Sequence, residues 1–340
     1  MTEAKAIFEV IPFSESAKEK IPFMYTRILV PLDGSTMAEQ VLAWVQILAK
    51  GLGSQVELLR VVEPAPQELS DVTHGVYAHQ IEDNLRSSAQ DYLKGLSDAL
   101  RNNDISVATT ARVGDPADCI ASEAGREADT LIAMTTHGRS GIGRWLLGSV
   151  TDKVLHTTTA PLLMARAYDQ EHPPEAVKFE TIIVPLDGSS LAEQVLPHAE
   201  SLAKALRLKV LLARAVPSLG EYHQYLEHHQ MDGSATIYAG TYEEFAQEAD
   251  ARAMEYLHQI KEQLTRRRVF SVEEKLLRGH AADSITELAQ EVPHSLVMMT
   301  THGRSGIGRW LLGSVTDRVV HQSRDLVLVV RATEPEESAG

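Results

Sequence analysis

The chain has 340 residues, 44% of them hydrophobic and 23% charged, and a formal net charge of −15. This composition excludes a fibrous or disordered chain, and the length predicts two domains of about 150 residues each. The negative charge disfavours nucleic-acid binding, and a single cysteine, Cys119, excludes an internal disulfide and a cysteine zinc site. Since no signal-peptide pattern and no apolar run of about 20 residues occurs, we expect a cytoplasmic protein that contacts no membrane.

Two long stretches of the sequence occur twice, which indicates a tandem duplication. ILVPLDGSTMAEQVL at 28–42 returns as IIVPLDGSSLAEQVL at 182–196, and MTTHGRSGIGRWLLGSVTD at 134–152 returns unchanged at 299–317. We predict a first domain at 25–166, a linker at 167–178 and a second domain at 179–331. The linker is polar, contains Pro173 and Pro174, and has no apolar period.

Short β-rich apolar runs alternate with helical patterns in each unit. In the first unit they predict strands at 27–31, 56–62, 105–113, 130–136 and 161–166, and helices at 36–52, 79–102, 116–127 and 149–158. Thr36 with Glu39, and Ser190 with Glu193, have the spacing of capping boxes at a helix start. The runs TLIAM and SLVMM are apolar on both faces, as buried parallel strands are. The predicted fold class is α/β, with two tandem doubly wound (Rossmann-like) domains, each with a five-stranded parallel sheet.

A segment at 217–245 makes the second unit longer than the first. Its His223, His228 and His229 could ligate a metal ion. Histidines of a polar loop are more often solvated, so we assign no metal site. We expect this acidic segment to offer a surface to a partner.

Ligands of open parallel sheets bind outside the carboxyl ends of the strands, where two loops of each unit meet. The first loop, PLDGS, begins at Pro31 in one unit and at Pro185 in the other. Its aspartate, Asp33 or Asp187, can accept a hydrogen bond from an adenine amino group or a ribose hydroxyl. The same aspartate can instead cap the turn into the next helix. Both roles stay open at this point.

The second loop has the composition of a phosphate cradle. Its glycines, which can adopt positive φ and let backbone N–H groups approach a ligand, are Gly138, Gly141, Gly143 and Gly148. Ser149 can cap the following helix or offer its hydroxyl to phosphate. The alternative is that the glycines only form turns and the serine only caps. The position after a strand, before a helix and opposite the aspartate favours the phosphate site.

No catalytic signature stands out in this loop or in the rest of the sequence, which favours binding over catalysis. His137 and His302 lack a carboxylate partner at a diagnostic spacing, so we assign them no catalytic role. No catalytic triad, metal-ligand cluster or P-loop signature occurs in the sequence. The arginines that could contact phosphate are Arg139, Arg144, Arg304 and Arg309.

These residues together resemble the universal stress protein family, over nearly the whole of each unit. Nucleotide-binding members of that family carry Gly-x2-Gly-x9-Gly-(Ser/Thr) between the fourth strand and the fourth helix. The matching residues are Thr135, Gly138, Gly148 and Ser149, and then Thr300, Gly303, Gly313 and Ser314. Threonine replaces the first glycine in both units, where it could crowd a nucleotide. The resemblance implies ATP binding, or ADP or AMP, with Mg²⁺ when the triphosphate is bound.

The resemblance also assigns nucleotide contacts outside the second loop. The aspartate matches Asp33 and Asp187, and the backbone that ends the second strand matches Val61 and Ala215. A Gly-x-Pro turn matches at Gly114, but the second unit has Gly279-His280-Ala281, so the two sites are expected to differ in affinity. The remaining residues assigned to the nucleotide are Pro31, Pro185, Arg139 and Arg304.

The family pairs through its last strands, which implies that 161–165 lies beside 326–330 within one chain, with a homodimer as a further possibility. We therefore expect a nucleotide-binding stress or signalling protein without strong catalysis. One alternative is a slow ATPase or an adenylyl-transferring enzyme. The other is an interaction module that holds no nucleotide, which Thr135 and Thr300 favour.

Overall fold

A computed structural model of the chain describes residues 24–64, 75–136, 147–168, 177–223, 241–301, 312–323 and 326–333. In the first unit the elements are β1 (Arg27–Leu32), α1 (Thr36–Glu39), α2 (Val41–Leu52), β2 (Gln55–Val62), α3 (Gly75–Arg101), β3 (Val107–Val113), α4 (Pro116–Ala124), β4 (Thr130–Thr136), α5 (Ser149–Thr157) and β5 (Leu162–Arg166). In the second they are β6 (Thr181–Pro185), α6 (Ser190–Glu193), α7 (Leu196–Leu206), β7 (Lys209–Val216), α9 (Tyr242–Arg266), β8 (Ser271–Arg278), α10 (Ala281–Glu291), β9 (Ser295–Thr300), α11 (Ser314–Gln322) and β10 (Leu326–Val330).

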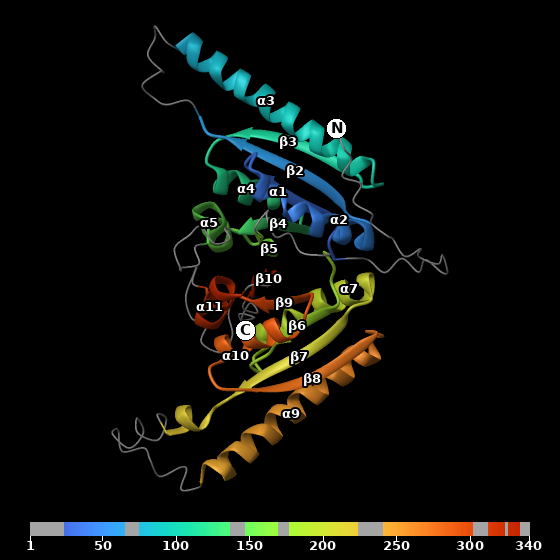
Figure 1. Ribbon diagram of the computed structural model, residues 1–340, viewed down its shortest axis with the longest axis vertical. Coiled ribbons are helices and arrows are strands. Elements are labelled where there is room, and N and C mark those ends of the chain that lie inside the picture. Colours follow the sequence, from blue (N-terminus) through green and yellow to red (C-terminus); the bar gives the residue numbers. More distant parts are fainter. Residues whose placement is uncertain are drawn as a thin grey trace, which may run out of the picture.

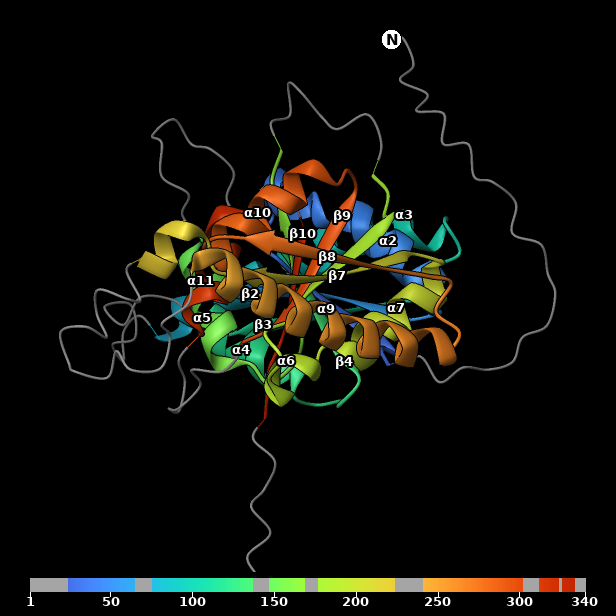
Figure 2. The ribbon, with the colours of Figure 1, turned by 90° about the horizontal axis from the view of Figure 1, so that it is seen from below.

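The strands form one ten-stranded sheet in the order β3-β2-β1-β4-β5-β10-β9-β6-β7-β8. Within each unit all five strands are parallel. Helices cover both faces (Figures 1 and 2). One face packs under α2, α3, α7 and α9, and the other under α4, α5, α10 and α11. The prediction of two doubly wound α/β units is confirmed.

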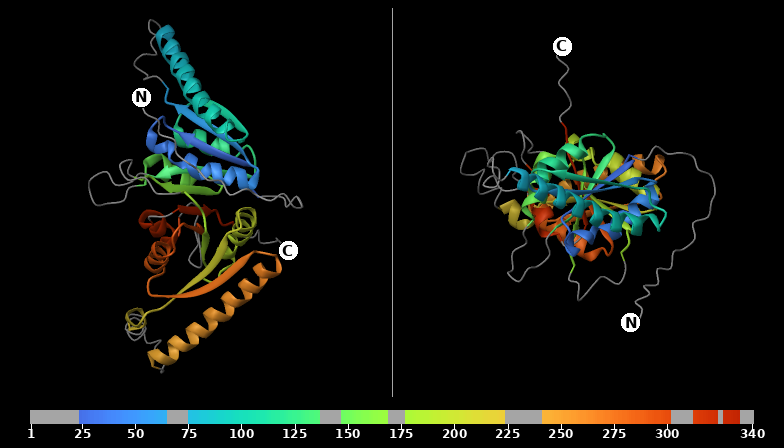
Figure 3. Two further views of the ribbon diagram at one scale, coloured as in Figure 1. Left: turned by 45° about the vertical axis from the view of Figure 1, so that its right-hand side comes forward. Right: turned by 90° about the horizontal axis from the view of Figure 1, so that it is seen from above.

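The two units meet where β5 lies antiparallel to β10, near the middle of the molecule (Figure 3). Leu163 lies directly opposite Leu328, and both side chains are fully buried. The hydrophobic core on each face of the sheet includes residues of both units. Since the cores continue across the junction, the units form one packed body.

Aromatic and polar contacts repeat about the junction with near two-fold symmetry. The rings of Trp44 and Phe179 meet edge to face with centroids 4.9 Å apart. At the matching positions, the Tyr25 hydroxyl lies 2.6 Å from His198 Nδ1. Two arginine guanidinium groups also reach across to backbone carbonyls of the other unit, in the pairs Arg166 to Ser323 and Arg331 to Thr158.

His198 gives this junction an expected dependence on pH. Burial lowers the pKa of His198 from 6.5 to about 4. The unfolded chain binds a proton at this histidine as the pH falls below 6.5, and the folded chain does so only near pH 4. Stability is therefore lost as the pH drops between these values, and we expect a loss of about 3 kcal/mol in the free energy of unfolding.

Urea unfolding at about pH 7 and at about pH 4.5 measures this loss. The control is His198→Phe, which places a ring that cannot ionise where the first repeat has Trp44. The substituted protein should lose less stability over the same interval. An equal loss in both proteins would contradict the assignment to His198.

The start of the first helix differs from the prediction in each unit. The helix predicted at 36–52 is divided at Gln40 into α1 and α2. The N-cap is Ser35, whose hydroxyl accepts the Ala38 N–H, so the predicted capping box at Thr36 is wrong. Ser189 likewise caps α6 in place of Ser190. The aspartate two residues before each cap accepts the serine N–H and hydroxyl, which fixes this serine as the cap.

Among the described residues, none of the helices combines the length and the apolar character that crossing a membrane requires.

Candidate functional site

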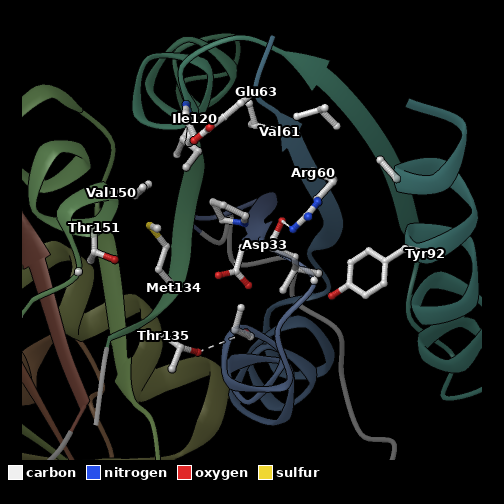
Figure 4. Close-up of a pocket in the computed structure, with 18 of the residues that line it drawn as sticks. Asp33, Arg60, Val61, Glu63, Tyr92, Ile120, Met134, Thr135, Val150 and Thr151 are labelled. Carbon is white, nitrogen blue, oxygen red and sulfur yellow. Dashed lines mark hydrogen bonds between the residues drawn. The ribbon is translucent and has the colours of Figure 1, made fainter. Parts of the chain in front are cut away.

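A cavity of about 700 Å³ opens at the carboxyl ends of β1, β2 and β4 in the first unit (Figure 4). This is the edge at which the winding of the sheet changes direction, between β1 and β4. The loop after β1, the start of α4 and the start of α5 complete one side, and α3 closes the other. The volume falls within the range of pockets that hold small molecules, about 300–1,000 Å³.

Asp33 projects into this cavity (Figure 4). Its Oδ1 accepts hydrogen bonds from the Ser35 N–H at 2.9 Å and the Ser35 hydroxyl at 2.6 Å. Burial raises the pKa of Asp33, but these hydrogen bonds and the charge of Arg60 outweigh it and leave the pKa below its usual value. The carboxylate is thus ionised at neutral pH. It orders the turn into α1, which is one of the two roles expected from the sequence, and it also lines the cavity.

Gly148 and Ser149 line the cavity at the start of α5. Gly148 is the N-cap, with φ −61° and ψ 144°, so the expected positive φ does not occur at this glycine. Ser149 is the first helical residue and makes no capping hydrogen bond, so the interpretation of this serine as the cap is wrong. Its side chain is exposed at the helix end. The free backbone N–H groups of that end favour an anion.

Thr135 lines the same cavity at the end of β4. Its hydroxyl donates a hydrogen bond to the Ala38 carbonyl at 3.2 Å (Figure 4). The threonine is therefore held against α1, and the cavity keeps its volume with this side chain in place.

The structure thus brings six predicted residues of the first unit to one cavity, namely Pro31, Asp33, Val61, Thr135, Gly148 and Ser149. Gly114 is not among its lining residues. This glycine has φ 151°, and a Cβ atom there would lie 2.9 Å from the Cys119 sulfur, so it serves the turn after β3. Gly138 and Arg139 lie outside the described residues.

Arg60 and Tyr92 form a wall of the cavity that the sequence interpretation missed (Figure 4). The Arg60 guanidinium donates to the Leu32 carbonyl at 3.2 Å and lies 5.9 Å from the centre of the Tyr92 ring. The Tyr92 hydroxyl donates to Glu39 at 2.8 Å. Burial and Glu39 raise the pKa of Tyr92, which keeps the phenol protonated as a donor. The sequence did contain a pattern that could have identified this wall, because arginine, tyrosine and glutamate recur at the matching positions of the second repeat.

The second unit has a smaller cavity, of about 210 Å³, at the equivalent edge. The predicted residues that line it are Pro185, Asp187, Ala215, Thr300, Gly313 and Ser314. Gly279 is not among its described lining residues, and its N–H donates to the Val216 carbonyl. Gly303 and Arg304 lie outside the described residues.

Contacts between α9 and the sheet accompany the smaller volume. The Arg214 guanidinium lies 4.9 Å from the centre of the Tyr256 ring, closer than in the first unit. Arg278, at the end of β8, pairs with Asp250 of α9. The first repeat has valine in place of this arginine, and α3 lines the larger cavity. The two cavities therefore differ in size and in the elements that enclose them.

In the part of the chain that the structure describes, no group of three or more histidine, cysteine or acidic side chains is arranged so that it could hold a metal ion. Of the three histidines considered in the sequence, His223 is described, and its ring lies 6.1 Å from the Tyr222 ring. His228 and His229 lie outside the described residues.

Comparisons with known proteins agree on one family. A model described as the universal stress protein family matches residues 24–166 and 178–331. A universal stress protein of Mycolicibacterium smegmatis is 25% identical over 309 residues, 89% of this chain and 96% of that protein. One from Bacillus subtilis is 28% identical over 148 residues, 42% of this chain and 100% of that protein. The crystal structure of a universal stress protein from Archaeoglobus fulgidus has a TM-score of 0.66 at 20% identity, covering 91% of this chain and 99% of that chain.

Proposed function

The chain belongs to the universal stress protein family, and we propose that it binds an adenine nucleotide, principally in its first unit, and acts without strong catalysis. The observation that carries the proposal is the cavity of about 700 Å³ between Asp33 and the start of α5. Its lining offers an ionised carboxylate and, from α5, the N-terminus of a helix. A nucleotide carries donors at its base and sugar and negative charge at its phosphates, so it complements both of these groups.

The residues fit this ligand in chemistry as well as in size. Asp33 would accept a hydrogen bond from the adenine amino group or a ribose hydroxyl. The Ser149 hydroxyl and the N–H groups at the start of α5 would bind phosphate. ATP, ADP and AMP share these groups, and Mg²⁺ would accompany the triphosphate. A strong general base is disfavoured, because the low pKa of Asp33 weakens it as a proton acceptor.

The first unit is proposed as the tighter site. Its cavity is the larger of the two, about 700 Å³ against about 210 Å³. Arg60 and Tyr92 extend it toward α3. We also propose that β5 and β10 supply, within one chain, the pairing that two separate units would otherwise make.

Equilibrium binding of ATP, ADP and AMP tests the proposal. Asp33→Asn should weaken nucleotide binding by at least about tenfold, because a charged hydrogen-bond acceptor is lost. The matched control is Asp187→Asn, which makes the same change in the smaller cavity and should leave the tighter site unchanged. Phosphate release by the wild-type protein, measured in parallel, should be negligible.

Three outcomes would contradict parts of this proposal. Absence of saturable binding at millimolar nucleotide would favour an interaction module that holds no nucleotide. A larger effect of Asp187→Asn than of Asp33→Asn would assign the tighter site to the second unit. Measurable turnover that Gly148→Val abolishes would identify an enzyme, because a bulky side chain at the helix start blocks the phosphate site.

A further inference from the structure

A separate cavity of about 250 Å³ lies between α3 and β3, toward the C-terminal end of α3. Its lining residues come from one face of the helix and one face of the strand at the edge of the sheet. They are Gln90, Leu93, Lys94, Ser97, Arg101, Thr109 and Ala111.

The chemistry of this cavity is basic and incompletely paired. Ser97 is only 1% exposed, and its hydroxyl makes no hydrogen bond. Lys94 and Arg101 lie on either side of it along the helix, and no acidic side chain is among the described lining residues. Arg101 donates to the Val107 carbonyl at 2.8 Å and pairs at 3.6 Å with the exposed Asp98. A buried donor without an acceptor is costly, and beside two cations the complementary partner is an anion.

The second unit shows what occupies the equivalent space. Thr109 pairs with Leu58 in the sheet, and Glu274 pairs with Leu212, so the threonine and the glutamate hold matching positions. The Glu274 carboxylate lies 3.4 Å from the Lys261 ammonium and 3.7 Å from His258 Nδ1. On the helix, Lys261 matches Ser97 of the first unit, and His258 matches Lys94. The second unit therefore places its own carboxylate between the helix and the strand.

The volume of the first-unit cavity follows from the same comparison. Thr109 is shorter than Glu274, Ala111 is smaller than the Leu276 that matches it, and Ser97 is shorter than Lys261. These three smaller side chains lie on facing positions of α3 and β3. The space that larger side chains fill in the second unit is therefore open in the first unit.

We propose that the cavity between α3 and β3 binds a small carboxylate-bearing metabolite, whose carboxylate takes the position that Glu274 holds in the second unit. The Lys94 ammonium and the Ser97 hydroxyl donate to it, and Arg101 adds positive charge at one end. The carboxylate is favoured over phosphate because a carboxylate of this same chain occupies the matching place. This site is independent of the nucleotide cavity and of the function proposed for it.

Amide chemical shifts of the full chain, followed by NMR during titration with succinate, test the proposal. Saturable shifts are expected at Ser97 and its neighbours, with glycerol as the neutral control. Thr109→Glu supplies an internal carboxylate and should weaken succinate binding by at least about tenfold. Ser97→Ala removes the buried hydroxyl with little change in shape and should also weaken it. The reverse change, Glu274→Thr, should create succinate-dependent shifts at Lys261.

Loss of binding in Thr109→Glu together with gain in Glu274→Thr would support the assignment. Absence of saturable shifts in the wild-type protein, or equal shifts in wild type and Thr109→Glu, would overturn it. Tighter binding of inorganic phosphate than of succinate would overturn the choice of a carboxylate.

Discussion

Replacing Glu123 by alanine is expected to lower the free energy of unfolding by about 1.5–3 kcal/mol, because it removes a buried carboxylate that accepts hydrogen bonds from charged arginines. Glu123 is 2% exposed and pairs with Arg112 at 2.7 Å and with Arg126. Burial raises the pKa of Glu123, but the hydrogen bonds and the charges of these two arginines have a larger, opposite effect. The pKa therefore lies below its usual value, and the carboxylate is ionised at neutral pH. Arg27, itself 3% exposed, donates to the Glu123 carbonyl and to the Glu57 carboxylate.

The second unit contains a control for this polar cluster. At the positions of Arg27, Glu57, Arg112 and Glu123 it has Thr181, Leu211, Leu277 and Leu288. The three leucines belong to the hydrophobic core on that face. Placing these four residues at the matching positions of the first unit would remove the buried charges, with their cost of desolvation, and put apolar contacts in their place. Such a replacement is often neutral or stabilising.

Urea unfolding of the single and the combined variants measures both effects. Glu123→Ala alone should destabilise the protein by this amount, and Arg27→Thr, Glu57→Leu, Arg112→Leu and Glu123→Leu together should restore most of the loss. If the combined variant is as unstable as the single one, the cluster contributes net stability that leucine contacts do not replace.

A second large effect is expected at the junction of β5 and β10. Leu163→Ala or Leu328→Ala should each cost about 2–5 kcal/mol, because each removes a fully buried side chain from the shared core. Since the two leucines lie directly opposite each other, the double substitution should cost less than the sum of the single ones.

Chemical denaturation of the four proteins completes a double-mutant cycle. Phe270→Ala is the control, because Phe270 is 81% exposed and its truncation should change stability by less than about 0.5 kcal/mol. Strict additivity of the two leucine substitutions would show that the strands do not meet as this register places them.

The features that sequence alone predicted were local or repeated. Apolar runs such as TLIAM become the central strands, and the two most faithfully repeated loops follow β1 and β4. Pro31, Asp33, Gly148 and Ser149 then line one cavity because parallel strands end at one edge. The positions of these residues follow from the chain order of strands and helices, which periodicity reveals.

The features that sequence alone missed depend on contacts between residues far apart in the chain, or on a choice between neighbouring residues that could serve the same role. Ser35 and Thr36 are adjacent hydroxyls that can both cap a helix, and the Asp33 turn selects the serine. Arg60 and Tyr92 meet only because α3 packs over β2. The cluster around Glu123 includes the contact of Arg27 with Glu123, which are 96 positions apart. A comparison of the two repeats, residue by residue, would have marked most of these positions.

Fusion of the two units within one chain removes a restriction that identical subunits obey. In a symmetric homodimer every contact between residues occurs twice, once on each side of the two-fold axis. A substitution therefore always changes both copies of a contact. Here Trp44 and His198 hold the same position in the two repeats, yet one meets Phe179 and the other meets Tyr25. Protonation of His198 can therefore change its contact with Tyr25 while the contact between Trp44 and Phe179 stays the same. Two identical subunits could not combine these two different contacts.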